Sequence, residues 1–135
     1  MSKSAIYMAD TASNAVAVGE NVPLGSTVRR FGCSLRGNGN AVTTMGGGYY
    51  RVSFTAAIAP TAAGTAVVTL MRDGSPVQGA VASTTATAAA QPQTVGFSAI
   101  VRDFQCACGS SANLTVLLTG ADSIVSSAAI EVEKL

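Results

Sequence analysis

Apolar side chains recur at every second position in many short stretches of this chain, which is the period of a β-strand. The clearest stretch is GGGYYRVSFTAAIAP, residues 46–60, whose apolar face consists of Tyr50, Val52, Phe54, Ala56 and Ile58. The opposite face is small and half apolar, with one charged residue. A strand with one solvated face alternates more cleanly between apolar and polar residues. The pattern therefore predicts either an unusually apolar surface or a second face that another copy of the chain covers.

The same period predicts an all-β domain, because no stretch of a dozen residues has apolar positions at helical spacing. Runs rich in Val, Ile, Thr, Tyr and Phe are bounded by Gly, Pro, Asn and Asp, as strands are. Ten strands are predicted, at residues 4–9, 15–18, 27–35, 41–45, 49–59, 65–72, 75–81, 94–104, 113–119 and 127–134. Turns are predicted at RDGSPV (72–77), RGNGN (36–40) and TGAD (119–122), and a low-complexity loop at 82–93.

Ten short strands in a chain of 135 residues indicate one domain, residues 1–135, with two packed antiparallel sheets. Three of the predicted strands are apolar on both faces, at 49–59, 94–104 and 127–134. One sheet is therefore expected to be covered on both sides and the other on one side. Residues 1–10 are expected to form either the first strand or an N-terminal arm.

Composition points to an assembly. Charged residues make up only 11% of the chain, against about 25% in an average soluble domain, while 48% of residues are apolar. The net charge is +1 with no histidine, which argues against a general nucleic-acid partner. No apolar run approaches the roughly 18 residues that span a bilayer, so no membrane partner is expected. The N-terminus lacks the apolar core of a signal peptide, so synthesis in the cytosol is expected.

The three cysteines, Cys33, Cys106 and Cys108, do not make a disulfide framework, which uses an even number. Zinc takes four Cys, His or carboxylate ligands, and there is no histidine to complete such a set. Free, largely buried thiols in a reducing compartment are predicted. Two alternatives stay open, namely thiolates from several subunits around a metal ion and a disulfide from Cys33 to one of the pair.

Nothing in the sequence assembles catalytic chemistry, so no enzyme activity and no cofactor are predicted. General-base catalysis without histidine would fall to a carboxylate or a lysine, and no nucleophile–base–orienter set can be assembled. Glu131 and Glu133 share one strand face, which is typical of a solvated surface or of a subunit contact with arginine. The aromatic residues Tyr49, Phe54 and Phe97 are interpreted as core and interface packing rather than as a ligand pocket.

Four motifs together resemble one family. They are TASNAVAVGENVPL (11–24), GYYRVSF (48–54), AGTAVVTLMRDGSPVQGA (63–80) and NLTVLLTGADSIVSSAAIEVEKL (113–135). Their order and spacing resemble the jelly-roll heads of tumour necrosis factor and the complement proteins. The chain is more similar still to the bacterial and phage branch of these heads, including the heads of collagen-like spore-surface glycoproteins, although it carries no Gly-X-Y stalk.

This resemblance implies a single ten-strand antiparallel jelly-roll sandwich that forms a homotrimer through its inner sheet. The strands that make the contact in the family correspond to the three strands that are apolar on both faces. The interface is accordingly predicted to include Tyr49, Arg51, Phe54, Phe97, Ile100, Ile130 and Glu131.

The resemblance also implies a function. A head without a stalk is similar to the trimeric decoration proteins of tailed-phage capsids, so a structural virion protein on the major capsid protein lattice is predicted, made in the cytoplasm of a bacterial host. The alternative is a trimeric head of a fibre or bacterial surface structure that binds a receptor or glycan. Arg29 and Arg30 are adjacent on a strand and should point to opposite sides. One of them is predicted to pair with an acidic residue of a partner, the alternative being two solvated arginines.

Overall fold

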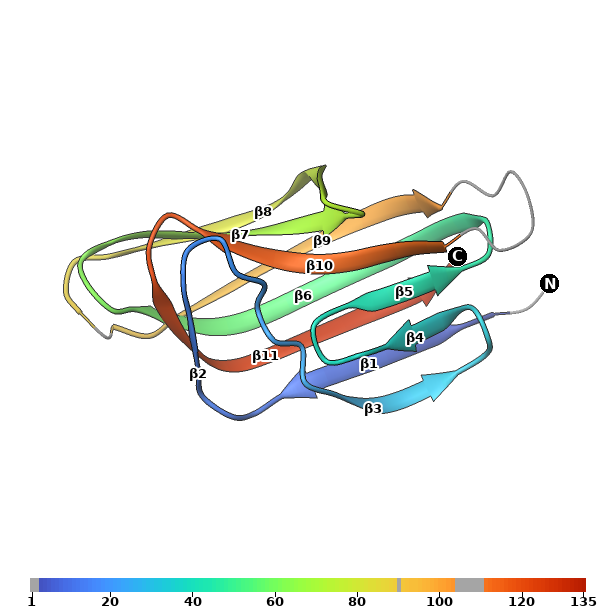
Figure 1. Ribbon diagram of the computed structural model, residues 1–135, viewed down its shortest axis with the longest axis horizontal. Coiled ribbons are helices and arrows are strands. Elements are labelled where there is room, and N and C mark those ends of the chain that lie inside the picture. Colours follow the sequence, from blue (N-terminus) through green and yellow to red (C-terminus); the bar gives the residue numbers. More distant parts are fainter. Residues whose placement is uncertain (1–2, 90, 104–110) are drawn as a thin grey trace.

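The computed structural model describes residues 3–89, 91–103 and 111–135, which form two antiparallel sheets packed face to face (Figure 1). Every element of the described part is a strand or an irregular connection, with no helix among them. The described residues form eleven strands, against the ten predicted. The all-β prediction is confirmed.

The six-stranded sheet contains β1 (Ala5–Asp10), β2 (Asn14–Val16), β3 (Ser26–Phe31), β6 (Gly48–Pro60), β9 (Gln93–Asp103) and β11 (Ser123–Lys134). Its order is β3-β1-β11-β6-β9, with β2 pairing with the start of β11. The five-stranded sheet contains β4 (Leu35–Gly37), β5 (Val42–Met45), β7 (Gly64–Arg72), β8 (Ser75–Ala86) and β10 (Ser111–Thr119), in the order β4-β5-β10-β7-β8. Because β11 lies between β1 and β6, the two ends of the chain meet in the middle of one sheet, as in a jelly roll.

The core lies between the sheets and takes every second residue of each long strand. On β6 these residues are the five that the sequence pattern placed on one face, all at most 3% exposed. The ring of Phe54 stacks on that of Phe97, with centroids 5.3 Å apart. The buried Tyr50 hydroxyl donates a hydrogen bond to the Gly46 carbonyl at 2.8 Å, which offsets the cost of burying a polar group.

The predicted hairpin at residues 72–77 is confirmed, and its turn residues explain its shape. Asp73 and Gly74 have φ angles of 51° and 84°, the left-handed conformation that two-residue hairpin turns require. Gly120, in the predicted turn at 119–122, has a φ of 90°, and a Cβ there would lie 2.2 Å from the carbonyl oxygen of Thr65. Glycine is therefore required at this turn on two counts.

Several predicted boundaries were wrong; the last strand, for example, begins at Ser123 rather than at residue 127. The strand expected at 27–35 is two strands, because the chain leaves one sheet and enters the other around Gly32, whose φ is 83°. The loop expected at 82–93 begins as the second half of β8, because Thr84 and Ala86 continue the buried alternation of that strand. Small residues are common in loops and also fit an alternating strand, so composition alone did not distinguish a loop from a strand here.

The N-terminal strand lies inside the six-stranded sheet. Ala5–Asp10 pairs with β3 on one side and β11 on the other, so these residues do not form a detached arm. Cys33 lies exposed on the connection between β3 and β4, so the prediction of a buried thiol was wrong for this residue. Cys106 and Cys108 lie outside the described residues, so the predictions about them stay untested.

Candidate functional site

The candidate site is the outward face of the six-stranded sheet, meaning the face that points away from the core. Because side chains alternate along a strand, the pairing register arranges this face in rows. One row runs Phe31, Ala5, Glu133, Arg51 and Ile100 from β3 to β9. The next row runs Arg29, Tyr7, Glu131, Ser53 and Ser98.

Large hydrophobic side chains gather on the outward face. Of the nine that are exposed in the described part of the chain, six lie on this face or at its edge: Tyr7 (40% exposed), Phe31 (58%), Tyr49 (52%), Ile100 (57%), Ile124 (38%) and Leu135 (54%). Single exposed hydrophobic residues are normal on a protein surface, but a group on one face marks an interaction surface. The outer face of the five-stranded sheet offers only Val81 from this set, on β8.

The outward face is hollowed. Its bulkiest side chains stand near the two edges, on β1 and β3 and on β6 and β9, whereas the middle carries Ser53, Thr55 and Ala129. A hollow next to the β3 edge is lined by Ala5, Ile6, Tyr7, Arg29, Phe31 and Glu131. A second hollow in the middle is lined by Tyr7, Ser53, Thr55, Ala129, Ile130 and Glu131. The face can therefore receive a convex apolar surface.

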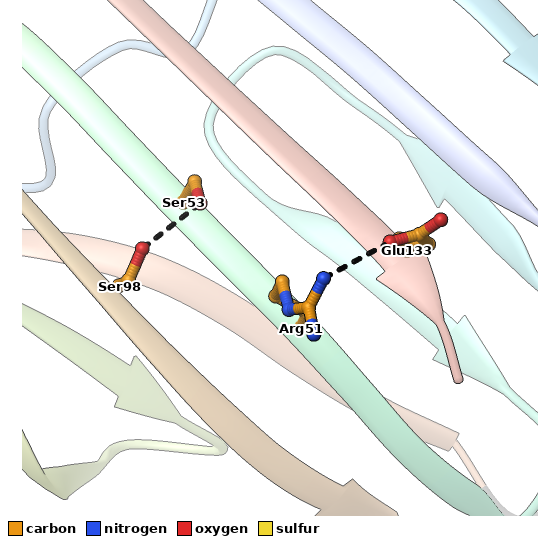
Figure 2. Close-up of polar contacts among 4 residues, drawn as sticks. All are labelled: Arg51, Ser53, Ser98 and Glu133. Atoms are coloured by element: carbon orange, nitrogen blue, oxygen red, sulfur yellow. Dashed lines mark hydrogen bonds and ion pairs between the residues drawn. The ribbon is translucent and has the colours of Figure 1, made fainter.

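The polar groups of the outward face interact with one another across neighbouring strands (Figure 2). Arg51 Nη1 lies 3.7 Å from Glu133 Oε1, and Ser53 Oγ lies 3.0 Å from Ser98 Oγ. The Arg51 and Glu133 side chains are 56% and 53% exposed, so the ion pair contributes at most about 1 kcal/mol to the stability of the isolated subunit. The guanidinium of Arg102 lies over the ring of Tyr49, 5.7 Å from its centroid.

Four of the predicted interface residues lie on the outward face, namely Tyr49, Arg51, Ile100 and Glu131. The prediction was wrong about the direction of Phe54 and Ile130, which are 1% and 0% exposed in the core of the subunit. The physical reason is the strand period, which puts them on the same side as the buried Val52 and Val132.

Phe97 is also directed toward the core, where it is half-buried against Phe54. Sequence reasoning missed Tyr7 and Phe31. The alternation of Ile6, Tyr7 and Met8 would have identified Tyr7 as outward-facing, because its two neighbours are core residues.

The two adjacent arginines of β3 point to opposite sides, as predicted. Arg29 lines the hollow beside Glu131 on the outward face. Arg30 Nη1 donates a hydrogen bond to the Leu35 carbonyl at 3.4 Å, toward the five-stranded sheet. Whether either arginine contacts a partner stays a prediction.

Within residues 3–89, 91–103 and 111–135, no three His, Cys, Asp or Glu side chains come together in a way that could hold a metal ion. A helix long and apolar enough to cross a membrane is likewise missing from this part of the chain. The chemistry that the outward face offers is apolar contact, a few hydroxyl groups and paired charges.

No protein-family model and no curated protein matches the sequence. Solved structures do match. Murine APRIL at pH 5.0 aligns with a TM-score of 0.75 and 13% identity, over 99% of this chain and 100% of that one. The globular domain of zebrafish complement 1qA protein aligns with a TM-score of 0.69 and 10% identity, over 95% of this chain and 94% of that one. The PRD1 vertex protein P5 aligns with a TM-score of 0.62 and 14% identity, over 98% of this chain and 96% of that one.

Identities this low show the fold alone. The chain has the jelly-roll fold of the TNF-like and C1q-like heads, which confirms what the sequence motifs implied about the fold. The narrower resemblance to the bacterial and phage branch stays a prediction.

Proposed function

We propose that this chain forms a homotrimer through the outward face of the six-stranded sheet and acts as a non-enzymatic structural head, a decoration protein on the capsid of a tailed phage. One observation carries the proposal. Six of the nine exposed large hydrophobic side chains of the described part gather on or at the edge of this face, which the family resemblance assigns to the threefold contact.

The shape of the face supports a contact between copies. In a ring of identical subunits, each subunit has two different contact patches. The first patch of one copy binds the second patch of the next copy. The outward face offers a hollow beside Tyr7 and Phe31 at one edge and the projecting side chains of Tyr49 and Ile100 at the other. Arg29 and Glu131 at the rim of the hollow supply polar contacts. An obligate interface of this kind hides on the order of 1,000 Å² or more per subunit.

The structural role is supported by the polar groups of the face. Arg51 and Glu133 pair with each other, and Ser53 pairs with Ser98, so these polar groups are matched within the subunit. The shared fold with a protein named as the vertex protein of PRD1 favours a place on a capsid. The low content of charged residues favours a protein that is permanently part of an assembly.

The test combines two measurements on one sample. Light scattering gives the mass of the purified protein, and undecorated phage capsids are then added in increasing amounts. We expect the mass of three chains and saturable binding to capsids. A trimer that does not bind capsids but binds cells or a glycan array would refute the decoration role in favour of a receptor- or glycan-binding head. A monomer would refute the use of the outward face.

A further inference from the structure

The charges of this molecule are segregated along the direction of the strands. Backbone pairing places the Lys and Arg residues toward the end of the sandwich that contains both chain termini, which we call the basic end: Lys3, Arg29, Arg30, Arg36, Arg51, Arg72, Arg102 and Lys134. It is the right-hand half of Figure 1, which contains β3, much of β1 and the C-terminal ends of β9 and β11.

Backbone pairing places most of these residues together independently of any view. The Lys134 amide donates to the Ser4 carbonyl at 2.8 Å, and the Leu135 amide donates to the Tyr49 carbonyl at 2.9 Å. Tyr49 in turn pairs with Arg102 across β6 and β9. Segments far apart in the sequence thus bring their positive charges to one end of the sandwich.

The charged residues toward the opposite end are all acidic, namely Asp10, Glu20 and Asp122, and we call it the acidic end. Each accepts a backbone hydrogen bond that holds a turn. Asp122 Oδ1 accepts from the Val18 amide at 2.8 Å, Glu20 Oε1 from the Ala17 amide at 3.0 Å and Asp10 Oδ1 from the Ala12 amide at 2.9 Å. Asp122 and Lys134 lie at the two ends of β11, roughly 35–40 Å apart at about 3.3 Å per residue, well beyond a Debye length of about 8 Å at physiological salt, whereas Arg29 pairs with Tyr7, three residues from Asp10.

The two ends differ in net charge. Four carboxylate residues, Asp73, Asp103, Glu131 and Glu133, accompany the eight cations of the basic end, which leaves +4 there and −3 at the acidic end, consistent with the overall +1. A threefold arrangement about an axis along the strands would point all three basic ends the same way. A ring with one strongly positive and one strongly negative end has an electrostatically determined orientation on a charged partner.

We propose that the basic end is the docking end of the head and that its partner is an acidic protein surface. This inference deepens the proposed function and rests on it for the identification of the partner as a capsid lattice. Leu135, 54% exposed just after the C-terminal end of β11, offers an apolar contact beside these charges, which favours a protein surface. Four acidic residues in the same half of the chain's fold and an overall pI near 7.7 are unlike a nucleic-acid-binding domain, whose pI exceeds about 9.

Two variants with the same net charge test the inference. The basic-end variant is Lys3→Gln, Arg30→Gln, Arg36→Gln, three exposed residues that line neither hollow of the outward face. The matched control is Ala12→Glu, Ala62→Glu, Ala88→Glu, three exposed residues in connections at the acidic end. Each variant lowers the charge of the chain by three, so the two have the same net charge but carry the change at opposite ends. Light scattering first checks that both keep the wild-type mass.

Binding is measured on a sensor coated with poly-L-glutamate and, separately, on undecorated capsids, at about 50 mM and about 500 mM salt. We expect the basic-end variant to bind both probes at least about tenfold more weakly at low salt, with a smaller difference at high salt, and the control to stay within about twofold of wild type. Equal losses in the two variants would overturn the inference, because net charge alone would explain them. Tighter wild-type binding to duplex DNA or anionic vesicles than to poly-L-glutamate would also overturn it.

The outcomes separate this inference from the proposed function. If the wild type binds capsids and only the control variant loses affinity, the decoration role stands and the docking end is the acidic one. If the wild type ignores capsids but binds poly-L-glutamate through its basic end, the decoration role fails and the docking end is supported. No binding of the wild type to either probe would overturn both.

Discussion

Replacing Ile100 by aspartate tests the outward face at its most exposed aliphatic side chain. Ile100 is 57% exposed in the isolated subunit and lies on β9 opposite Arg51 of β6. Since its side chain projects away from the core, the substitution should change the free energy of unfolding of one subunit by no more than about 0.5 kcal/mol. If Ile100 is covered in a trimer, the same substitution should strongly weaken the association of the subunits.

The expected loss can be estimated from the exposed fraction. Full burial of an isoleucine contributes about 1.5–3 kcal/mol, so covering the 57% that is exposed contributes roughly 1–2 kcal/mol per interface. Three equivalent interfaces would lose roughly 3–5 kcal/mol, and burial of an unpaired carboxylate adds a penalty of several more. At about 1.4 kcal/mol for each factor of ten, trimer dissociation should become easier by at least about a thousandfold.

Sedimentation velocity on Ile100→Asp at micromolar concentration is the assay, with circular dichroism to confirm the β-sheet signal. We expect a folded monomer or, if the exposed faces aggregate, insoluble protein. The matched control is Val81→Asp, on the outer face of the five-stranded sheet, where Val81 is 49% exposed. It should remain a trimer. A soluble trimer from Ile100→Asp, or equal dissociation of both variants, would refute the assignment of the interface.

Three further predictions concern the subunit itself. Phe54→Ala should lower the free energy of unfolding by about 3–5 kcal/mol in urea titrations, because its ring is buried in the core, and a loss below about 1 kcal/mol would contradict that placement. Gly120→Ala should cost more than about 2 kcal/mol, since its φ is 90° and the new Cβ would meet the Thr65 carbonyl oxygen; a neutral effect on the melting temperature would count against the turn. A double-mutant cycle on Arg51 and Glu133 should give a coupling below about 1 kcal/mol in the monomeric background, and a much larger value would mean that the pair is not solvated.

The sequence predicted the inside of the molecule better than its outside. The period of two along β6 identified all five of its core side chains between Tyr50 and Ile58, and Asp73–Gly74 located the hairpin. The predicted interface was wrong at Phe54 and Ile130. Large apolar side chains suggested an interface there, but the strand period of two places both residues on the core side. A large aromatic side chain suits a core and an interface equally well, so only its position relative to neighbouring core residues distinguishes them.

Other features depend on topology that no local pattern contains. Phe31 belongs to β3, whose six residues are all exposed and whose register with β1 shifts between Tyr7 and Met8, so no alternation reveals its side. The segregation of charge likewise appears only after folding. Arg102 and Lys134 are far apart in the sequence and come to one end because β9 and β11 run in the same direction on either side of β6.

The most direct test of the central claim is the mass of the wild-type protein in solution, measured by light scattering at micromolar concentration. If copies of the chain cover the outward face, the measured mass should be that of three chains of 13.4 kDa each and should stay constant on dilution to the nanomolar range. A mass of 13.4 kDa at micromolar concentration would contradict the claim, because Tyr7, Phe31, Tyr49 and Ile100 would then face solvent in the functional state.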